Sequence, residues 1–511
     1  MSRLAELLVS AEAAMAAIPD GATVACGGFV GTGHPEALSI ALEQRFKTSQ
    51  TPRDLTLVYG AGQGDGKERG LNHLAHAGLL KRVVGGHWGL APKLGTLALS
   101  GAIEAYNFPQ GVICQLYRDI AAGRPGCITH VGLDTCVDPL HGGGRLNDRT
   151  PAGLVERVQL GGKTWLWYHS FPLTVGLIRA SAVDPFGNLV MDEEALVGDV
   201  LAIAQAVRNS GGMVIAQVAR VLDAPAEPHR VRVPGILVDR VVVAPCEDYA
   251  QTGGVLANPD FVRCAPDGAV TPAHLPNDER RIIAARACDE LPAGAIANLG
   301  IGIPEGVAVV AAERGLLDSV ILTVESGVIG GTPAGGLSFG AARFPQAIID
   351  QPAQFDFYDG HGLDFSALGA AQIDRHGNVN VSRFAGRVAG VGGFINISQT
   401  AKRLVFCTTF TAGGLEVAFD GTSLAITREG KNPKFVPEVE QLSFNANRAR
   451  ELGQEVLYVT ERAVFRLGAE GLELIEVAPG IDLQRQVLDL LPFTPRITDL
   501  RVMPLCCGNI P

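Results

Sequence analysis

The sequence lacks the features of a membrane, secreted or nucleic-acid-binding protein. It has no run of about 18 uncharged apolar residues, so no membrane span is expected. Basic residues are in deficit, with 42 Lys and Arg against 53 Asp and Glu, and no nucleic-acid-binding surface is expected. The ten cysteines contain no CxxC pair, which favours reduced thiols and a cytoplasmic location. Residues 1–18 mix apolar and charged residues at helical spacing, which predicts an amphipathic helix rather than a signal peptide.

Glycine is abundant, with 63 residues in a chain of 511. That length predicts two or three domains. Hydrophobic residues make up 47% of the chain and the mean hydropathy is +0.20, both high values. Many tight strand-to-helix turns would use this glycine, as they do in α/β enzymes.

The chain repeats itself. Residues 20–38 and 292–308 each read as a short strand, a glycine-rich loop and a Pro-Glu pair that opens a helix. A second matched pair follows in the same order, at residues 183–190 and 373–380. The repeat predicts an α/β fold with two homologous open halves, each a mostly parallel sheet flanked by helices. The expected boundaries are a first half at 1–225, a connector at 226–276 that contains strand-like runs at 236–238 and 240–243, and a second half at 277–511.

Glu325 stands at the end of the apolar run 319–324 and is followed at once by Gly327. The run reads as a buried strand, and a carboxylate at the tip of such a strand is costly unless it is paired or functional. A structural carboxylate that caps nearby backbone is the alternative to a catalytic one. The surrounding glycines would let a ligand approach closely.

Two glycine-rich turns in the second half, at 300–304 and 390–393, could offer backbone N–H groups to an oxyanion. A carboxylate nucleophile that attacks an acyl carbon generates such an oxyanion. Neither a Ser-His-Asp pattern nor a metal-ligand cluster competes near Glu325. The glycine spacing around Gly300 is GxGxxxG, which is not the dinucleotide fingerprint, so a nicotinamide cofactor is not expected.

The order of these motifs resembles the β half of family I coenzyme A transferases. The matching segments are 298–304, 324–330, 369–378 and 390–393, while the loop 27–35 and the segments 106–111 and 121–126 resemble the α half. The resemblance spans nearly the whole chain, as in single-chain members with fused halves. With Gly85–Gly89, it is closest to the acetate/propionate branch, which acts on short-chain acyl groups. Many members carry Ser-Glu-Asn-Gly where this chain has Val-Glu-Ser-Gly at 324–327.

The resemblance implies a CoA-transferase that works by ping-pong chemistry through a glutamyl-CoA thioester on Glu325. Coenzyme A is then substrate and covalent intermediate, with no metal and no permanently bound cofactor. The expected partners are acyl-CoA and small carboxylates, without nucleic acid or membrane, in a homo-oligomer. The residues implied to contact CoA or the oxyanion are Gly300, Ile301, Gly302, Ile303, Gly390, Gly392, Gly393 and Lys402. The implied acyl pocket contains Gly28, Phe29, Gly31 and Gln110.

Several alternatives remain open on the sequence alone. The protein could be an acyl-CoA hydrolase that uses the same glutamate, or a non-catalytic CoA-binding protein. Aligning the two halves on their strands places Tyr59 opposite Glu325, whereas aligning them on their glycines places Gly60 there. His73 and His76 are expected to be a packed or surface pair rather than metal ligands.

Overall fold

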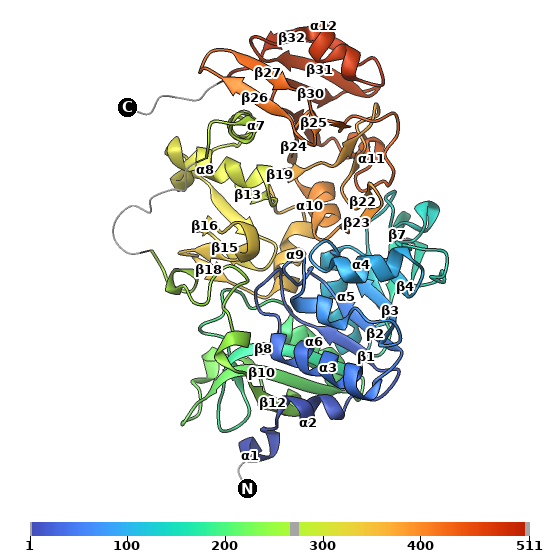
Figure 1. The fold of residues 1–511 in the computed structure, drawn as a ribbon, viewed down its shortest axis with the longest axis vertical. Helices are drawn as coiled ribbons and strands as arrows, with labels where there is room; N and C mark the ends of the chain where they lie inside the picture. Colours follow the sequence, from blue (N-terminus) through green and yellow to red (C-terminus); the bar gives the residue numbers. More distant parts are fainter. Residues whose placement is uncertain (1–2, 266–274, 506–511) are drawn as a thin grey trace. The chain divides into compact units, whose positions relative to one another are not determined.

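The computed structural model describes residues 3–265 and 275–505 (Figure 1). The chain divides into two compact units. The first contains residues 1–265 together with 324–356 and 387–396, and the second contains residues 266–323, 357–386 and 397–511. Two segments of the predicted second half therefore belong to the first unit. The predicted boundaries at 225 and 276 concern homology between the halves and stay a prediction.

The first unit is built on a mostly parallel sheet in the order β11-β9-β8-β1-β2-β3-β4, with β10 and β12 added beside β8. Only the pairs formed by β9 with β8 and with β11 are antiparallel. The strand bounds are β1 Thr23–Cys26, β2 Leu55–Tyr59, β3 Leu80–Gly85, β4 Glu104–Asn107, β8 Val175–Val183, β9 Leu189–Val190, β10 Met213–Val221, β11 Val231–Val233 and β12 Arg240–Val243.

Both faces of this sheet are apolar, because successive strand residues point to opposite sides and both sides are covered. On β2, Leu57 packs in one cluster and Val58 in the other. One cluster includes helices α5 (Gln110–Ala121) and α6 (Val200–Asn209). The other includes α2 (Ala11–Ala16), α3 (Glu36–Ser49) and α4 (Pro92–Leu99). A side sheet is formed by β5 Gly126–Thr129, β6 Val155–Leu160 and β7 Lys163–His169.

The second unit has a sheet in the order β14-β13-β19-β24-β29-β30-β31-β32. The strands are parallel from β14 to β29, and β30 is antiparallel to both of its neighbours. Their bounds are β13 Ile296–Leu299, β14 Ile321–Val324, β19 Phe365–Gly369, β24 Arg403–Cys407, β29 Glu455–Val459, β30 Ala463–Leu467, β31 Leu472–Val477 and β32 Arg496–Val502. Its helices include α7 Glu279–Cys288, α8 Gly306–Glu313, α11 Ala446–Glu451 and α12 Leu483–Gln486.

The second sequence repeat has the same turn geometry in each unit. Asp184 Oδ1 accepts the backbone N–H of Asn188 at 2.9 Å, and Asp184 Oδ2 accepts its side-chain amide at 3.0 Å. Asp374 makes the same two bonds to Asn378, both at 3.0 Å. A short polar side chain that bonds the backbone ahead of it stabilises a tight turn. The repeat read from the sequence is thus a repeat of hydrogen bonding as well.

Two local predictions are wrong. The described part of segment 1–18 forms two short helices, α1 (Arg3–Leu7) and α2, because Val9 N–H bonds to Val241 O on β12 and Ser10 caps the new helix. The strand-like run 236–238 follows Pro234, and Leu237 N–H bonds back to Pro234 O in a 3₁₀ turn. A Pro-Gly pair favours such a turn over a strand.

Among the residues described, no helix is long and apolar enough to cross a membrane.

Candidate active site

Glu325 directly follows β14 and is the first residue of a turn, with a half-buried side chain. Gly327 closes that turn by donating its N–H to Val324 O at 3.0 Å. The next residue, Ser326, is buried and donates its hydroxyl to Gly340 O at 2.6 Å. The backbone on both sides of Glu325 is therefore held by hydrogen bonds.

Glycine is required at position 327. Its φ is +106°, a region that side chains rarely adopt, and an added Cβ would lie 2.0 Å from Ile349 O. The two residues are also hydrogen-bonded through other atoms, since Ile349 N–H donates to Gly327 O at 2.8 Å. The segment that contains Ile349 thus supports the Glu325 turn from behind.

The strand residues on each side of the turn pack against the first-half loop 27–33. Val324 and Val328 share one buried cluster with Phe29, Val30 and Ala61. The first unit therefore brings together the predicted nucleophile and part of the predicted acyl pocket. Phe29 is 2% exposed and its ring lies 5.9 Å from that of Phe339.

Two glycines of the loop 27–33 are needed for close packing. An added Cβ at Gly28 would lie 2.9 Å from Gln63 Oε1, and one at Gly31 would lie 2.5 Å from Gly253 N. The loop is therefore held between neighbouring segments at both positions. Its conformation depends on glycine, which agrees with its place in the sequence repeat.

The predicted oxyanion turn 390–393 is bound to first-half loops. Gly392 N–H donates to Gly86 O at 2.8 Å, and Gly392 O accepts Gln110 N–H at 2.8 Å. Val391 N–H donates to Asn107 Oδ1 at 3.0 Å. The N–H of Gly392 is therefore used within the protein, and Gly390 and Gly393 remain the candidate donors in this turn.

Gln110 and His87 lie beside this turn. Gln110 begins α5, is 3% exposed, and its side-chain Nε2 has no hydrogen-bond partner among the described residues. His87 lies against two glycines, since a Cβ added at Gly392 would be 3.6 Å from His87 Cβ and one at Gly62 would be 2.5 Å from its Nδ1. Burial lowers the pKa of His87 to about 4, so the ring is neutral near pH 7.

The loop 300–304 and Lys402 belong to the second unit. Gly300 N–H donates to Ala367 O at 2.9 Å, and Gly302 N–H bonds the Glu305 carboxylate. The expectation of a loop with freely exposed donors is therefore wrong at both glycines. Ile301 is 52% exposed and, with Ile303, carries the remaining candidate N–H groups. Lys402 Nζ pairs with Asp364 Oδ1 at 2.8 Å.

Comparison with known proteins decides the family. A family model for coenzyme A transferase matches residues 8–244. The chain is 43% identical over 501 residues to acetate CoA-transferase YdiF of Escherichia coli (strain K12), which covers 97% of this chain and 94% of that protein. The chain belongs to the coenzyme A transferase family. Caffeate CoA-transferase of Acetobacterium woodii is 42% identical over 503 residues, covering 97% and 96% of the two chains.

A solved structure agrees with this assignment. The acyl-CoA transferase YdiF from E. coli O157:H7, in a thioester complex with CoA, matches this CoA-transferase with a TM-score of 0.92 and 41% identity, covering 98% of this chain and 96% of that one. The predicted α/β class with two mostly parallel sheets is confirmed, and the protein is a CoA-transferase enzyme.

Sequence reasoning missed one buried acid near the site of this CoA-transferase. Asp199 is 3% exposed, and Cβ atoms added at Gly27 and Gly60 would lie 3.5 and 3.6 Å from its carboxylate oxygens. Burial raises the pKa of Asp199 to about 7. Its neighbour Gly198 accepts the N–H of Gln351, two residues beyond Ile349. Asp199 belongs to no recognisable sequence motif, so no pattern in the sequence could have revealed it.

The histidine pair is packed, as expected. His73 Nδ1 and His76 Nε2 lie 2.6 and 2.7 Å from the two carboxylate oxygens of Glu43. Glu36, the acid of the first Pro-Glu pair, accepts Gly70 N–H at 3.0 Å and contacts His73. Among the described residues, no group of three or more His, Cys, Asp or Glu side chains could hold a metal ion.

Proposed function

We propose that this CoA-transferase moves coenzyme A from a short-chain acyl-CoA to a carboxylate acceptor such as acetate, through a glutamyl-CoA thioester on Glu325. The observation that carries the proposal is the Glu325 turn, which is held by Gly327 and Ser326 and packed on the Phe29 loop. The names of the two relatives at 42–43% identity, acetate and caffeate CoA-transferase, support a carboxylate acceptor.

The chemistry requires no external base. The Glu325 carboxylate attacks the thioester carbonyl, and the C–S bond breaks to give a mixed anhydride and the CoA thiolate. The thiolate then attacks the Glu325 carbonyl carbon, forming the glutamyl-CoA thioester and releasing the donor acid as a carboxylate. An acceptor carboxylate reverses both steps and leaves as acyl-CoA. Charge and protons balance throughout, because one carboxylate enters and one leaves.

The remaining predicted residues take supporting roles in this proposal. Backbone N–H groups of Gly390 and Gly393, with those of Ile301 and Ile303, would stabilise the oxyanion or contact CoA. One such donor typically contributes about 3 kcal/mol to the transition state. Lys402 would contact a CoA phosphate while keeping its ion pair with Asp364, since an ammonium group has three N–H donors. Phe29 and Gln110 would line the acyl pocket.

The hydrolase alternative differs only in what resolves the thioester. Water would replace the acceptor carboxylate, and the product would be free CoA. The full-length relatives compared above are named transferases, which favours a carboxylate acceptor. A purely binding role is not favoured, because this family membership makes the chain an enzyme.

Mass spectrometry tests the proposal directly. After incubation with acetyl-CoA and no acceptor, the peptide that contains Glu325 should carry CoA, and added acetate should remove it faster than buffer does. Glu325→Ala should lose both the adduct and the transferase activity. Glu416→Ala is the matched control, since Glu416 is an exposed glutamate that pairs with Arg428. Full activity in Glu325→Ala would disprove the mechanism, and loss of the adduct at the same rate in buffer would identify a hydrolase.

A further inference from the structure

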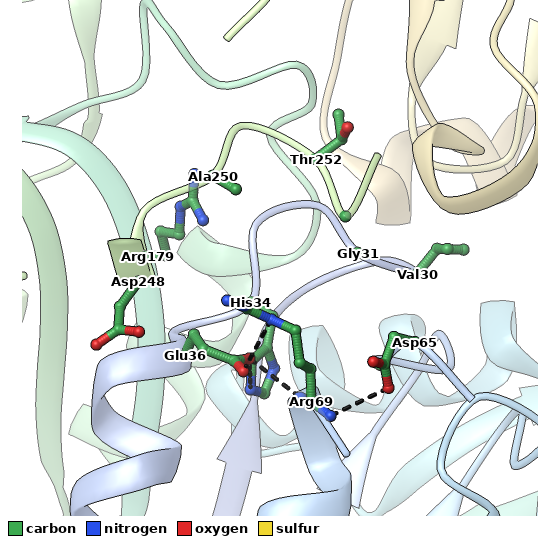
Figure 2. Close-up of a pocket in the computed structure, with 13 residues that line it drawn as sticks. Val30, Gly31, His34, Glu36, Asp65, Arg69, Arg179, Asp248, Ala250 and Thr252 are labelled. Atoms are coloured by element: carbon green, nitrogen blue, oxygen red, sulfur yellow. Dashed lines mark hydrogen bonds and ion pairs between the residues drawn. The ribbon is translucent and has the colours of Figure 1, made fainter. Parts of the chain in front are cut away.

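A cavity of about 110 Å³ lies in the first unit, against the loop that contains Val30 and Gly31 (Figure 2). Its walls also include His34, Arg69, Arg179 and the segment from Asp248 to Gly253. No residue of the Glu325 turn or of the 390–393 turn lines it. The cavity has room for about three or four water volumes, so any ligand it holds is small.

Arg179 supplies the feature that distinguishes this cavity from a surface hollow. The side chain is 3% exposed, its Nε donates to Glu194 Oε1 at 3.1 Å, and its guanidinium lies 3.9 Å from the Tyr249 ring centroid. Its Nη2 is buried and has no hydrogen-bond partner within the described ranges. A buried charged N–H group without an acceptor is unfavourable, and an acceptor atom in the cavity would relieve it.

A second guanidinium faces the same space. Figure 2 shows Arg179 entering beside Ala250, and Arg69 entering from the other side, over Glu36. Arg69 Nε pairs with Glu36 Oε1 at 3.2 Å, and its side chain is 50% exposed. Two guanidinium groups on facing walls suit an oxyanion, because their planar forks can each donate to a separate oxygen.

The acidic groups around the cavity are largely compensated. Burial alone would raise the pKa of Glu36, but His73 and Arg69 hold it down to about 2, so the negative charge of this carboxylate is already compensated by its neighbours. Asp65 Oδ1 accepts the backbone N–H groups of residues 67, 68 and 69 at 2.8 to 3.1 Å.

Two further titratable groups face the cavity. Burial and the nearby Glu36 raise the pKa of Asp248, and burial lowers the pKa of His34, which favours the neutral ring. Among the described residues that line the cavity, the unsatisfied side-chain group is thus a donor on Arg179, which selects an acceptor ligand over a cation. Glu194 Oε2 also has no hydrogen-bond partner among the described residues, but Glu194 does not line the cavity.

We propose that this cavity binds one small oxyanion, either a carboxylate or a tetrahedral anion, between Arg179 and Arg69. The site is additional to the proposed reaction at Glu325. Val30 lines the cavity and also packs with Val324 and Val328, so a bound anion would contact the loop that supports the catalytic turn.

Isothermal titration calorimetry tests the site with acetate, sulfate and phosphate, each against chloride at matched ionic strength. Wild type should bind at least one of them saturably, and the preferred anion separates a carboxylate from a tetrahedral ligand. Arg69→Gln should weaken binding roughly tenfold or more, as expected for a lost charge-assisted hydrogen bond. Ala250→Leu should abolish binding by filling the cavity while leaving both arginines in place.

The control is Arg220→Gln, because Arg220 forms an exposed pair with Glu193 outside the cavity. It should bind like wild type. Saturable binding of none of the three anions, or binding that Ala250→Leu leaves unchanged, would overturn the proposal. A heat of acetate binding that persists in Ala250→Leu would be assigned to another site and would count against this one. The CoA adduct on Glu325 is measured separately, so either proposal can fail alone.

Discussion

Gly60 and Glu325 occupy equivalent positions in two matched pairs of parallel strands. In the first unit Ala25 pairs with Val58, two residues before Gly60, and in the second Asn298 pairs with Thr323, two residues before Glu325. Matching Gly21 with Gly294 and Gly27 with Gly300 in the sequence repeat aligns Ala25 with Asn298. The strand register then aligns Gly60 with Glu325. The alternative alignment, which placed Tyr59 opposite Glu325, is wrong.

This relationship predicts that the acid cannot be moved to the other half. A Cβ at Gly60 would lie 3.2 Å from Cys114 Sγ and 3.6 Å from the Asp199 carboxylate. A glutamate there would be crowded and close to a second acid. The double variant Gly60→Glu with Glu325→Ala should therefore form no CoA adduct in mass spectrometry. An adduct on residue 60 would contradict the assignment of a single catalytic half.

Gly327→Ala should destabilise the protein by about 2 kcal/mol or more and abolish activity. The reasons are the positive φ and the 2.0 Å approach of Ile349 O. Gly336→Ala is the control: its φ is +60°, but nothing lies within 4 Å of an added Cβ, so a cost of only about 1 kcal/mol is expected. Thermal unfolding and transferase assays would compare them, and equal losses would contradict the tight packing of the Glu325 turn.

Gln110→Ala should lower kcat/KM for the acyl donor about tenfold, because its buried Nε2 has no hydrogen-bond partner among the described residues and could donate to the substrate. Gln115 on the same helix instead donates to Pro352 O at 2.9 Å and Asp356 Oδ1 at 2.6 Å. Gln115→Ala should leave kcat/KM nearly unchanged. Steady-state kinetics with acetyl-CoA checks both, and an unchanged Gln110→Ala would remove this residue from the acyl pocket.

Asp199→Asn should stabilise the protein increasingly as pH rises from 4 to 7. The pKa of Asp199 is raised from 3.8 to about 7 in the folded state, so between these values the native chain keeps a proton that the unfolded chain releases. Wild-type stability from this group therefore falls with rising pH, by roughly 4 kcal/mol over the window. The difference in melting temperature between Asp199→Asn and wild type is measured at pH 5 and at pH 7.5. A difference that is the same at both pH values would show that Asp199 is ionised in the folded protein and would contradict the prediction.

Local sequence pattern predicted the parts of the site that depend on one strand and its following turn. Glu325 lies directly after its strand, as expected from the apolar run that precedes it. These features follow from strand period, apolar composition and glycine, all of which act over a few residues.

Features that depend on tertiary packing could not be predicted in this way. The donors of Gly392 and Gly300 are used by Gly86 O and Ala367 O, which are distant in sequence. The buried groups Arg179 and Asp199 likewise acquire their properties from neighbours on other elements. The cytoplasmic location and homo-oligomeric state stay predictions.

The first unit also sets an order for biosynthesis. Its first 265 residues leave the ribosome before segments 324–356 and 387–396, which complete it. At about 5–20 residues per second, this delay is on the order of ten seconds. During that time Phe29 and Val30 lack the covering side chains of Val324 and Val328. The nascent chain therefore carries an apolar surface that its own later segments help to cover, and translation must pass residue 342 before the buried cluster around Phe29 is complete.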